Sequence, residues 1–92
     1  MKDTNIKTLE VYTYGEGDVL VDTIGMTDSQ IRVLEVELEI SEFETLEEIT
    51  NIVERFKEFE SVDDVFDYYT NERAMDERDA HYTSLAFIEE IN

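Results

Sequence analysis

Among the residues of this chain that could take part in chemistry, the carboxylates are the most numerous. Asp and Glu supply 25 of the 92 residues against 7 Lys and Arg, so the formal net charge is −18. General acid–base catalysis needs two carboxylates in environments that separate their pKa values, and so acidic a sequence singles out no such pair. His81 has no second His, no Cys and no G-x-S-x-G motif beside it. We therefore expect no enzymatic activity.

Two acidic clusters have the ligand type that Ca²⁺ accepts, because carboxylate oxygens are hard donors. Neither cluster has the spacing and central glycine of an EF-hand loop. The two glycines of the segment Tyr-Gly-Glu-Gly lack the third glycine and the Lys of a phosphate-binding loop. We expect solvated acidic surface here, with no metal and no cofactor. The clusters are Asp63, Asp64 and Asp67, and Asp76, Glu77 and Asp79.

The remaining use of this acidity is to imitate nucleic acid. DNA-binding grooves are lined with Lys and Arg that neutralise phosphates, and an array of carboxylates can satisfy the same groove. A globule of this length has a diameter of roughly 32 Å, over which duplex DNA carries about 19 charges. The net charge of −18 is close to that number. The charge therefore predicts a DNA mimic whose partner is a DNA-binding protein, with no direct binding to nucleic acid.

The first half of the chain predicts strands that would carry part of this negative charge. Residues 9–14 and 18–23 are rich in Val, Leu and Tyr, and the segment Gly15-Glu16-Gly17 between them suits a tight reversal, which predicts a β-hairpin. Residues 34–40 alternate strictly between apolar and acidic side chains, which predicts a third strand. Its carboxylates would form a row with spacings of about 6.6 to 6.8 Å. These are Glu35, Glu37 and Glu39.

An alternative for residues 28–40 stays open, because Thr27 or Asp28 can cap a helical turn there. After Ser41 the spacing changes to that of a helix, with apolar residues from 46 to 56 on one side. Ser61 and Asp64 resemble a capping box that begins a second helix.

The end of the chain predicts a loop or weak helix over residues 71–80. Thr83 or Ser84 can cap a last short helix, with Leu85, Ile88 and Ile91 on one face. The abundant, periodic apolar residues favour a folded domain over disorder. We therefore predict a single α+β domain spanning residues 1–92. It consists of a small antiparallel three-stranded sheet, the hairpin plus the third strand, packed with two to three short helices.

The predicted partner-binding surface consists of the carboxylates on the third strand and on the first two helices. A rigid array of this kind suits a cationic groove. Its members are Glu35, Glu37, Glu39, Glu44, Glu47, Glu48, Glu54, Glu58, Asp63, Asp64 and Asp67.

Three phrases of the sequence resemble ArdA-type antirestriction proteins. Residues 14–21, Tyr-Gly-Glu-Gly-Asp-Val-Leu-Val, look like the opening "YNEG-x-L-x-G" of that family. Residues 40–49, Ile-Ser-Glu-Phe-Glu-Thr-Leu-Glu-Glu-Ile, are similar to its helix start "ISEYESIEEL", and residues 82–90 to its ending "Y-x-S-x-x-x-x-A-E-E". The tryptophan that follows the first strand pair in the family has no counterpart here.

The resemblance implies a DNA mimic that blocks the DNA channel of a type I restriction-modification enzyme, and a chain able to form a homodimer. Two alternatives remain open: an anti-CRISPR protein that blocks a Cas nuclease, and a non-mimic acidic adaptor that binds a basic protein. The sequence has no run of about 20 apolar residues and no apolar signal-peptide segment. We therefore expect no membrane association, and a location in the cytoplasm of a bacterial host cell.

Overall fold

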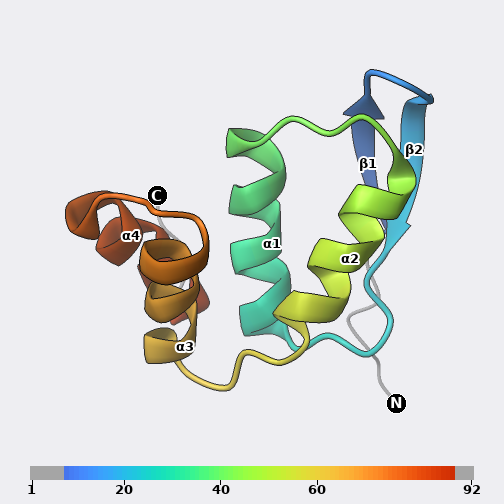
Figure 1. The fold of residues 1–92 in the computed structure, drawn as a ribbon. Coiled ribbons are helices and arrows are strands. Elements are labelled where there is room, and N and C mark those ends of the chain that lie inside the picture. The colour runs from blue at the N-terminus through green and yellow to red at the C-terminus, as the bar shows by residue number, and fades with distance from the viewer. Residues whose placement is uncertain (1–7, 89–92) are drawn as a thin grey trace, which may run out of the picture.

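A β-hairpin followed by helices makes up the part of the chain that the structure, a computed structural model, describes, residues 8–88 (Figure 1). Strand β1 (Thr8–Thr13) pairs antiparallel with β2 (Gly17–Asp22), and Val11 lies opposite Val19. Gly17 begins β2 with φ +75°, a left-handed conformation that glycine adopts without steric cost. The predicted hairpin is confirmed.

The segment predicted as a third strand is part of a helix, α1 (Asp28–Ile40). Its first turn is held by a capping box: the Thr27 hydroxyl accepts a hydrogen bond from the Gln30 N–H at 3.2 Å, and the Gln30 side chain accepts one from the Thr27 N–H at 2.9 Å. Gln30 also donates to two backbone carbonyls in the loop after α2, at 3.1 and 2.9 Å. Gln30 therefore stabilises the start of α1 through bonds to its N-cap residue and to the loop after α2.

The alternating pattern of residues 34–40 is misleading because it also satisfies a helix. Ile31, Leu34 and Leu38 follow the spacing of one helical face, and Leu and Glu are good helix formers. Among the described residues the sheet therefore has two strands, and the prediction of three is wrong.

Helix α2 (Leu46–Phe56) begins at the N-cap Thr45 and confirms the predicted helix after Ser41. Helix α3 (Val62–Asp67) begins at Ser61 with the predicted capping box and continues into a π-helical turn, η1 (Tyr68–Glu72).

The last part of the prediction needs correction. Helix α4 (Glu77–Ser84) begins inside the predicted loop or weak helix, and Thr83 and Ser84 lie at its end instead of capping a new helix. A 3-10 turn, η2 (Leu85–Phe87), follows. The structure thus has four α-helices instead of two to three over residues 8–88. Ile91, together with the end of the phrase at residues 82–90, lies outside the described residues.

Helix α1 lies between the hairpin with α2 on one side and α3 with α4 on the other (Figure 1). The core follows this arrangement, since Leu34, Ile49, Phe56, Val65 and Tyr69 come from four helical segments and are fully buried. Phe56 and its aromatic neighbours pack at ring-centroid distances of 4.7 to 6.5 Å. One core therefore fixes the relative positions of the elements that carry the surface carboxylates.

Candidate functional site

The predicted row of Glu35, Glu37 and Glu39 does not form, because these residues belong to a helix. Side chains two residues apart on a helix point about 200° apart, whereas those four apart share a face about 6 Å apart along the axis. Glu35 and Glu39 therefore share one side of α1, and Glu37 faces the opposite side with an exposed fraction of 0%. The predicted spacing is wrong, and Glu37 is not part of a partner-binding surface.

Glu37 instead forms the centre of a buried polar cluster. Its carboxylate accepts hydrogen bonds from the Tyr69 hydroxyl at 2.7 Å, the Ser41 hydroxyl at 2.8 Å and the Arg73 guanidinium at 2.5 Å. Arg73 also donates to the Ser41 hydroxyl at 2.9 Å and lies 5.7 Å from the centre of the Tyr69 ring. Burial and the Glu37 charge raise the pKa of the Tyr69 phenol. The cluster joins α1 to η1 and serves the fold.

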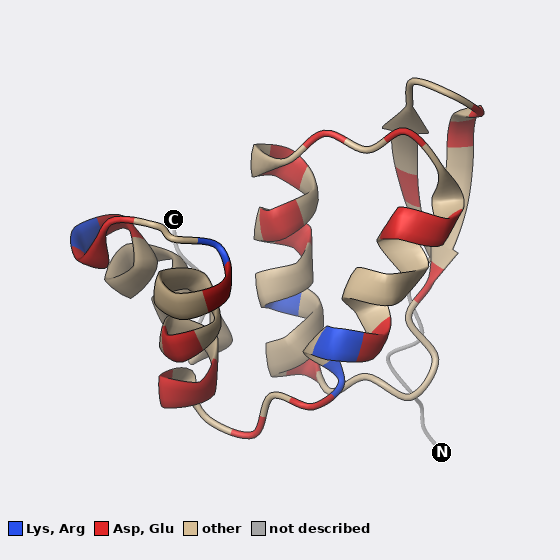
Figure 2. Ribbon diagram, in the orientation of Figure 1, with Lys and Arg blue, Asp and Glu red and all other residues tan. Residues whose placement is uncertain are grey.

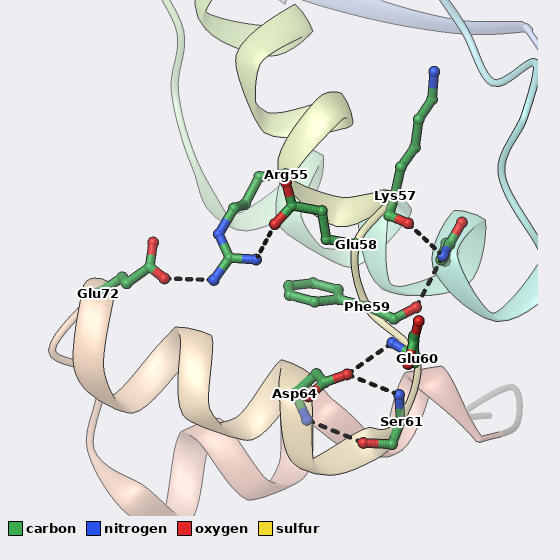
Figure 3. Close-up of polar contacts among 9 residues, drawn as sticks. Arg55, Lys57, Glu58, Phe59, Glu60, Ser61, Asp64 and Glu72 are labelled. Atoms are coloured by element: carbon green, nitrogen blue, oxygen red, sulfur yellow. Dashed lines mark hydrogen bonds and ion pairs between the residues drawn. The ribbon is translucent and has the colours of Figure 1, made fainter.

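Two further predicted contact residues accept hydrogen bonds from helix starts. The Asp64 carboxylate accepts from the N–H groups of Glu60 at 2.8 Å and Ser61 at 3.2 Å (Figure 3). The Glu48 carboxylate accepts from the N–H of Glu44 at 2.8 Å. Carboxylates at helix N-termini are stabilised by the local field and by these bonds. Asp64 and Glu48 thus have local structural roles.

Glu54 and Glu58 form surface ion pairs. Lys57 lies 3.2 Å from Glu54. Arg55 lies 3.3 Å from Glu58 and 2.5 Å from Glu72 (Figure 3). Exposed pairs of this kind contribute about 0 to 1 kcal/mol and exchange readily with solvent. Both carboxylates therefore remain accessible to a cationic partner at small cost.

The other predicted carboxylates lie on the surface of α1, α2, α3 and the loop before α2. Figure 2 shows acidic residues on both strands and all four helices, with basic residues few between them. Within residues 8–88 the ion pairs involve four carboxylates, Glu37, Glu54, Glu58 and Glu72. Most of the negative charge thus faces solvent. These surface residues are Glu35, half-buried, and Glu39, Glu44, Glu47, Asp63 and Asp67, exposed.

A groove of about 550 Å³ lies between β1 and the C-terminal half of α1. Among the described residues its lining includes four carboxylates and no Lys or Arg, and its two tyrosines are 60 to 62% exposed with ring centroids 5.7 Å apart. A hydrogen bond to the Glu42 carboxylate raises the pKa of Tyr14. Carboxylates beside exposed aromatic rings favour cations, which the ring faces also attract. The groove is lined by Leu9, Glu10, Val11, Tyr12, Tyr14, Glu35, Leu38, Glu39, Ser41, Glu42 and Phe43.

Four of the six Glu and Tyr residues in this lining are absent from the predicted surface: Glu10, Tyr12, Tyr14 and Glu42. The alternation along β1 is a signal for the first three, since residues two apart in a strand share a face. No sequence signal indicates Glu42. It reaches the groove because residues 43 and 44 bind the end of β1, where the Tyr14 N–H donates to the carbonyl of residue 43 at 3.0 Å.

A second groove of about 430 Å³ separates β2 from α2 and has a different character. Leu20 and Ile24 line it and are exposed by 67 and 57%, and its charged residues include both signs, such as Glu54 and Lys57. It therefore lacks the uniform negative charge of the first groove.

Two kinds of feature are absent from residues 8–88. No three Asp, Glu or His side chains in this range are grouped so that they could hold a metal ion. No helix there combines the length and apolar character needed to cross a bilayer.

Comparisons with protein-family models, with curated proteins and with solved structures found no match to this chain. The resemblance to ArdA-type proteins therefore depends on the three phrases alone. A functional proposal therefore depends on the charge and shape of the surface.

Proposed function

We propose that the protein is a DNA mimic that inhibits a host defence enzyme by occupying its nucleic-acid groove. The proposed target is a type I restriction-modification enzyme, and the alternative target is a Cas nuclease. One observation carries the proposal: acidic residues occur on both strands and all four α-helices, while the Lys and Arg residues of the described part of the chain are few and most of them form contacts within the fold (Figure 2).

Arg32 illustrates this commitment of the basic residues. Its guanidinium donates to the backbone carbonyls of Ala86, Phe87 and Ile88 at 3.0 to 3.2 Å, so it satisfies the end of η2. The guanidinium keeps its positive charge, which the formal net charge of −18 already includes. The excess of negative charge is large enough to steer a cationic groove toward the chain.

The dimensions agree with a short DNA segment. The longest extent of residues 8–88 is 38 Å, a length at which duplex DNA has about 11 base pairs and about 22 phosphate charges. The formal net charge of the whole 92-residue chain, −18, is comparable. Because the surface carboxylates are attached to one packed core, binding orders less backbone than it would in a disordered polyanion.

Competition with DNA is the decisive test. A purified type I restriction enzyme would be titrated with the protein in the presence of increasing amounts of duplex DNA. A mimic must lose binding in proportion to the occupancy of the groove by DNA. A complex that forms equally well on the DNA-filled enzyme would refute mimicry and favour the acidic adaptor.

A pair of charge-matched variants tests which surface makes the contact. We expect the triple replacement of Glu39, Glu44 and Glu47 by Gln to weaken inhibition at least about tenfold, because each charge-assisted contact contributes about 1 kcal/mol or more. The control replaces Asp76, Glu77 and Asp79 with Asn, Gln and Asn and removes the same charge at α4. Equal losses in both variants would show that no particular face is used. Glu37 stays unchanged in both, because it supports the fold.

A further inference from the structure

The outer edge of β1 has backbone groups that no second described strand pairs. Within residues 8–88, β1 belongs to a two-stranded sheet, so β2 occupies one of its sides. On the other side Thr13 forms an isolated parallel bridge with Phe43, and the next bonds follow at Tyr14 and Gly15. This contact covers only the C-terminal end of β1. The rest of the edge opens into the acidic groove.

The contact with Phe43 shows which backbone groups face the open edge. The Tyr14 N–H points away from β2, since it donates to the Phe43 carbonyl at 3.0 Å. Backbone groups of successive residues in a strand alternate between its two sides, so those of Glu10 and Tyr12 point the same way. Within the described residues no hydrogen bond outside β2 uses the Glu10 N–H, the Glu10 carbonyl or the Tyr12 N–H. An edge of this kind is a template for another strand.

The side chains around the edge select a positive partner. Glu10, Glu39 and Glu42 line the groove together with the exposed rings of Tyr12 and Tyr14, and no Lys or Arg of residues 8–88 lines it. We propose that the open edge of β1 binds an extended basic segment of a partner protein as an additional strand. This proposal rests on the proposed function insofar as the partner is a cationic protein. Backbone hydrogen bonds would supply affinity, and the carboxylates and aromatic rings would select Arg and Lys.

A second copy of the chain fits this edge poorly. Pairing of two β1 strands would bring together two groove surfaces whose charged residues, within the described part of the chain, are all acidic, and like charges across a strand pair destabilise it. Each copy also has a net charge of −18. The open stretch from Thr8 to Tyr12 has a length of roughly 16 Å, which suits about five residues with Arg or Lys at alternate positions.

A synthetic peptide tests the proposal without the host enzyme. The probe is acetylated and amidated Arg-Val-Arg-Val-Arg-Val, titrated into ¹⁵N-labelled protein and followed by NMR. We expect the amide signals of Glu10 and Tyr12 to shift and their hydrogen exchange to slow at least about tenfold at saturation, because new backbone bonds protect them. The same peptide methylated at every backbone nitrogen keeps its charge but loses its donors, and it should bind at least about tenfold more weakly.

Three variants separate backbone pairing from charge. Glu10→Pro removes an outward N–H, so we expect at least about tenfold weaker binding, whereas Glu10→Gln should cost about two- to threefold. Leu20→Pro is the matched control, because Leu20 lies opposite Glu10 and its backbone groups point from the other edge of the hairpin. It should leave binding unchanged. Circular dichroism verifies that each variant folds.

Three results would overturn the proposal: equal binding of the methylated peptide, equal effects of Glu10→Pro and Leu20→Pro, or slow exchange of Glu10 and Tyr12 before peptide is added. The first and third need no variant, so a folding failure of Glu10→Pro leaves the test intact. If the peptide results fail while DNA still competes for the host enzyme, mimicry stands and this edge has no part in it. If DNA does not compete but the peptide binds as expected, the basic strand is recognised outside a DNA groove.

Discussion

Replacing Glu37 with Gln should destabilise the fold by about 2 to 3 kcal/mol, although the two side chains have almost the same shape. The carboxylate accepts hydrogen bonds from the Tyr69 hydroxyl, the Ser41 hydroxyl and Arg73. An amide offers one acceptor oxygen, and its NH₂ group would face donors that it cannot satisfy.

The magnitude follows from the burial of these groups. Tyr69 is 0% exposed, and a buried hydroxyl without an acceptor costs about 1 to 3 kcal/mol. The Arg73 side chain is 33% exposed, so its guanidinium can turn toward water and adds about 1 kcal/mol or less. Removal of one negative charge reduces self-repulsion and offsets a small part of the loss. In a domain of this size, 2 to 3 kcal/mol corresponds to a fall in Tm of about 10 to 20 °C.

The assay is urea and thermal unfolding followed by circular dichroism. Glu39→Gln is the matched control, because it makes the same change on the exposed side of α1 and should alter stability by less than about 0.5 kcal/mol. In a double-mutant cycle, Tyr69→Phe should couple to Glu37→Gln by about 1 kcal/mol. A loss for Glu37→Gln no larger than that for Glu39→Gln would refute the assignment of Glu37 as a buried hydrogen-bonding centre.

Other predictions follow from individual contacts. Burial and the nearby Glu37 charge raise the pKa of Tyr69, so the folded protein keeps a proton that the unfolded chain releases. Stability present below about pH 10 should therefore fall as the pH rises further, by up to about 1.4 kcal/mol per pH unit, and Tyr69→Phe should flatten this slope in urea titrations at several pH values. Gly15→Ala should cost about 1 to 3 kcal/mol in thermal unfolding, because its Cβ would lie 2.5 Å from the Glu44 carbonyl oxygen; an unchanged Tm would contradict this close approach. Gln30→Ala should cost about 2 to 3 kcal/mol and Thr27→Ala about 1, since Gln30 also satisfies two carbonyls after α2. Equal losses in urea titration would show that the cap alone matters.

Local signals predicted the elements whose ends depend on short-range chemistry. The hairpin follows from two apolar runs around Gly15 and Gly17, and α3 from the capping box of Ser61 and Asp64. In each case the side chain or glycine acts within a few residues, so neighbouring sequence is sufficient. The net charge is a property of composition alone and needs no fold.

Residues 34–40 are a segment for which the local sequence pattern predicted the wrong element. Strict alternation describes a strand, but the Thr27–Gln30 box and the packing of Leu34 against distant helices stabilise a helix instead. Pattern alone cannot weigh these contacts, because a period of two leaves apolar residues on a helical face as well. Because these residues form a helix and not a strand, the predicted row of carboxylates does not form.

The division of the carboxylates into buried, capping and free groups is decided by tertiary structure alone. Glu37 and Glu39 are the same residue type two positions apart, yet one satisfies Tyr69 in the core and the other faces solvent. The groove also needs Glu42 beside β1, which depends on a contact between segments about 30 residues apart in sequence. The sequence by itself determined that the protein is a strongly acidic, folded domain. Only tertiary contacts, such as the bonds between α1 and η1 and those of residues 43 and 44 to the end of β1, decided which acids are buried and which face solvent.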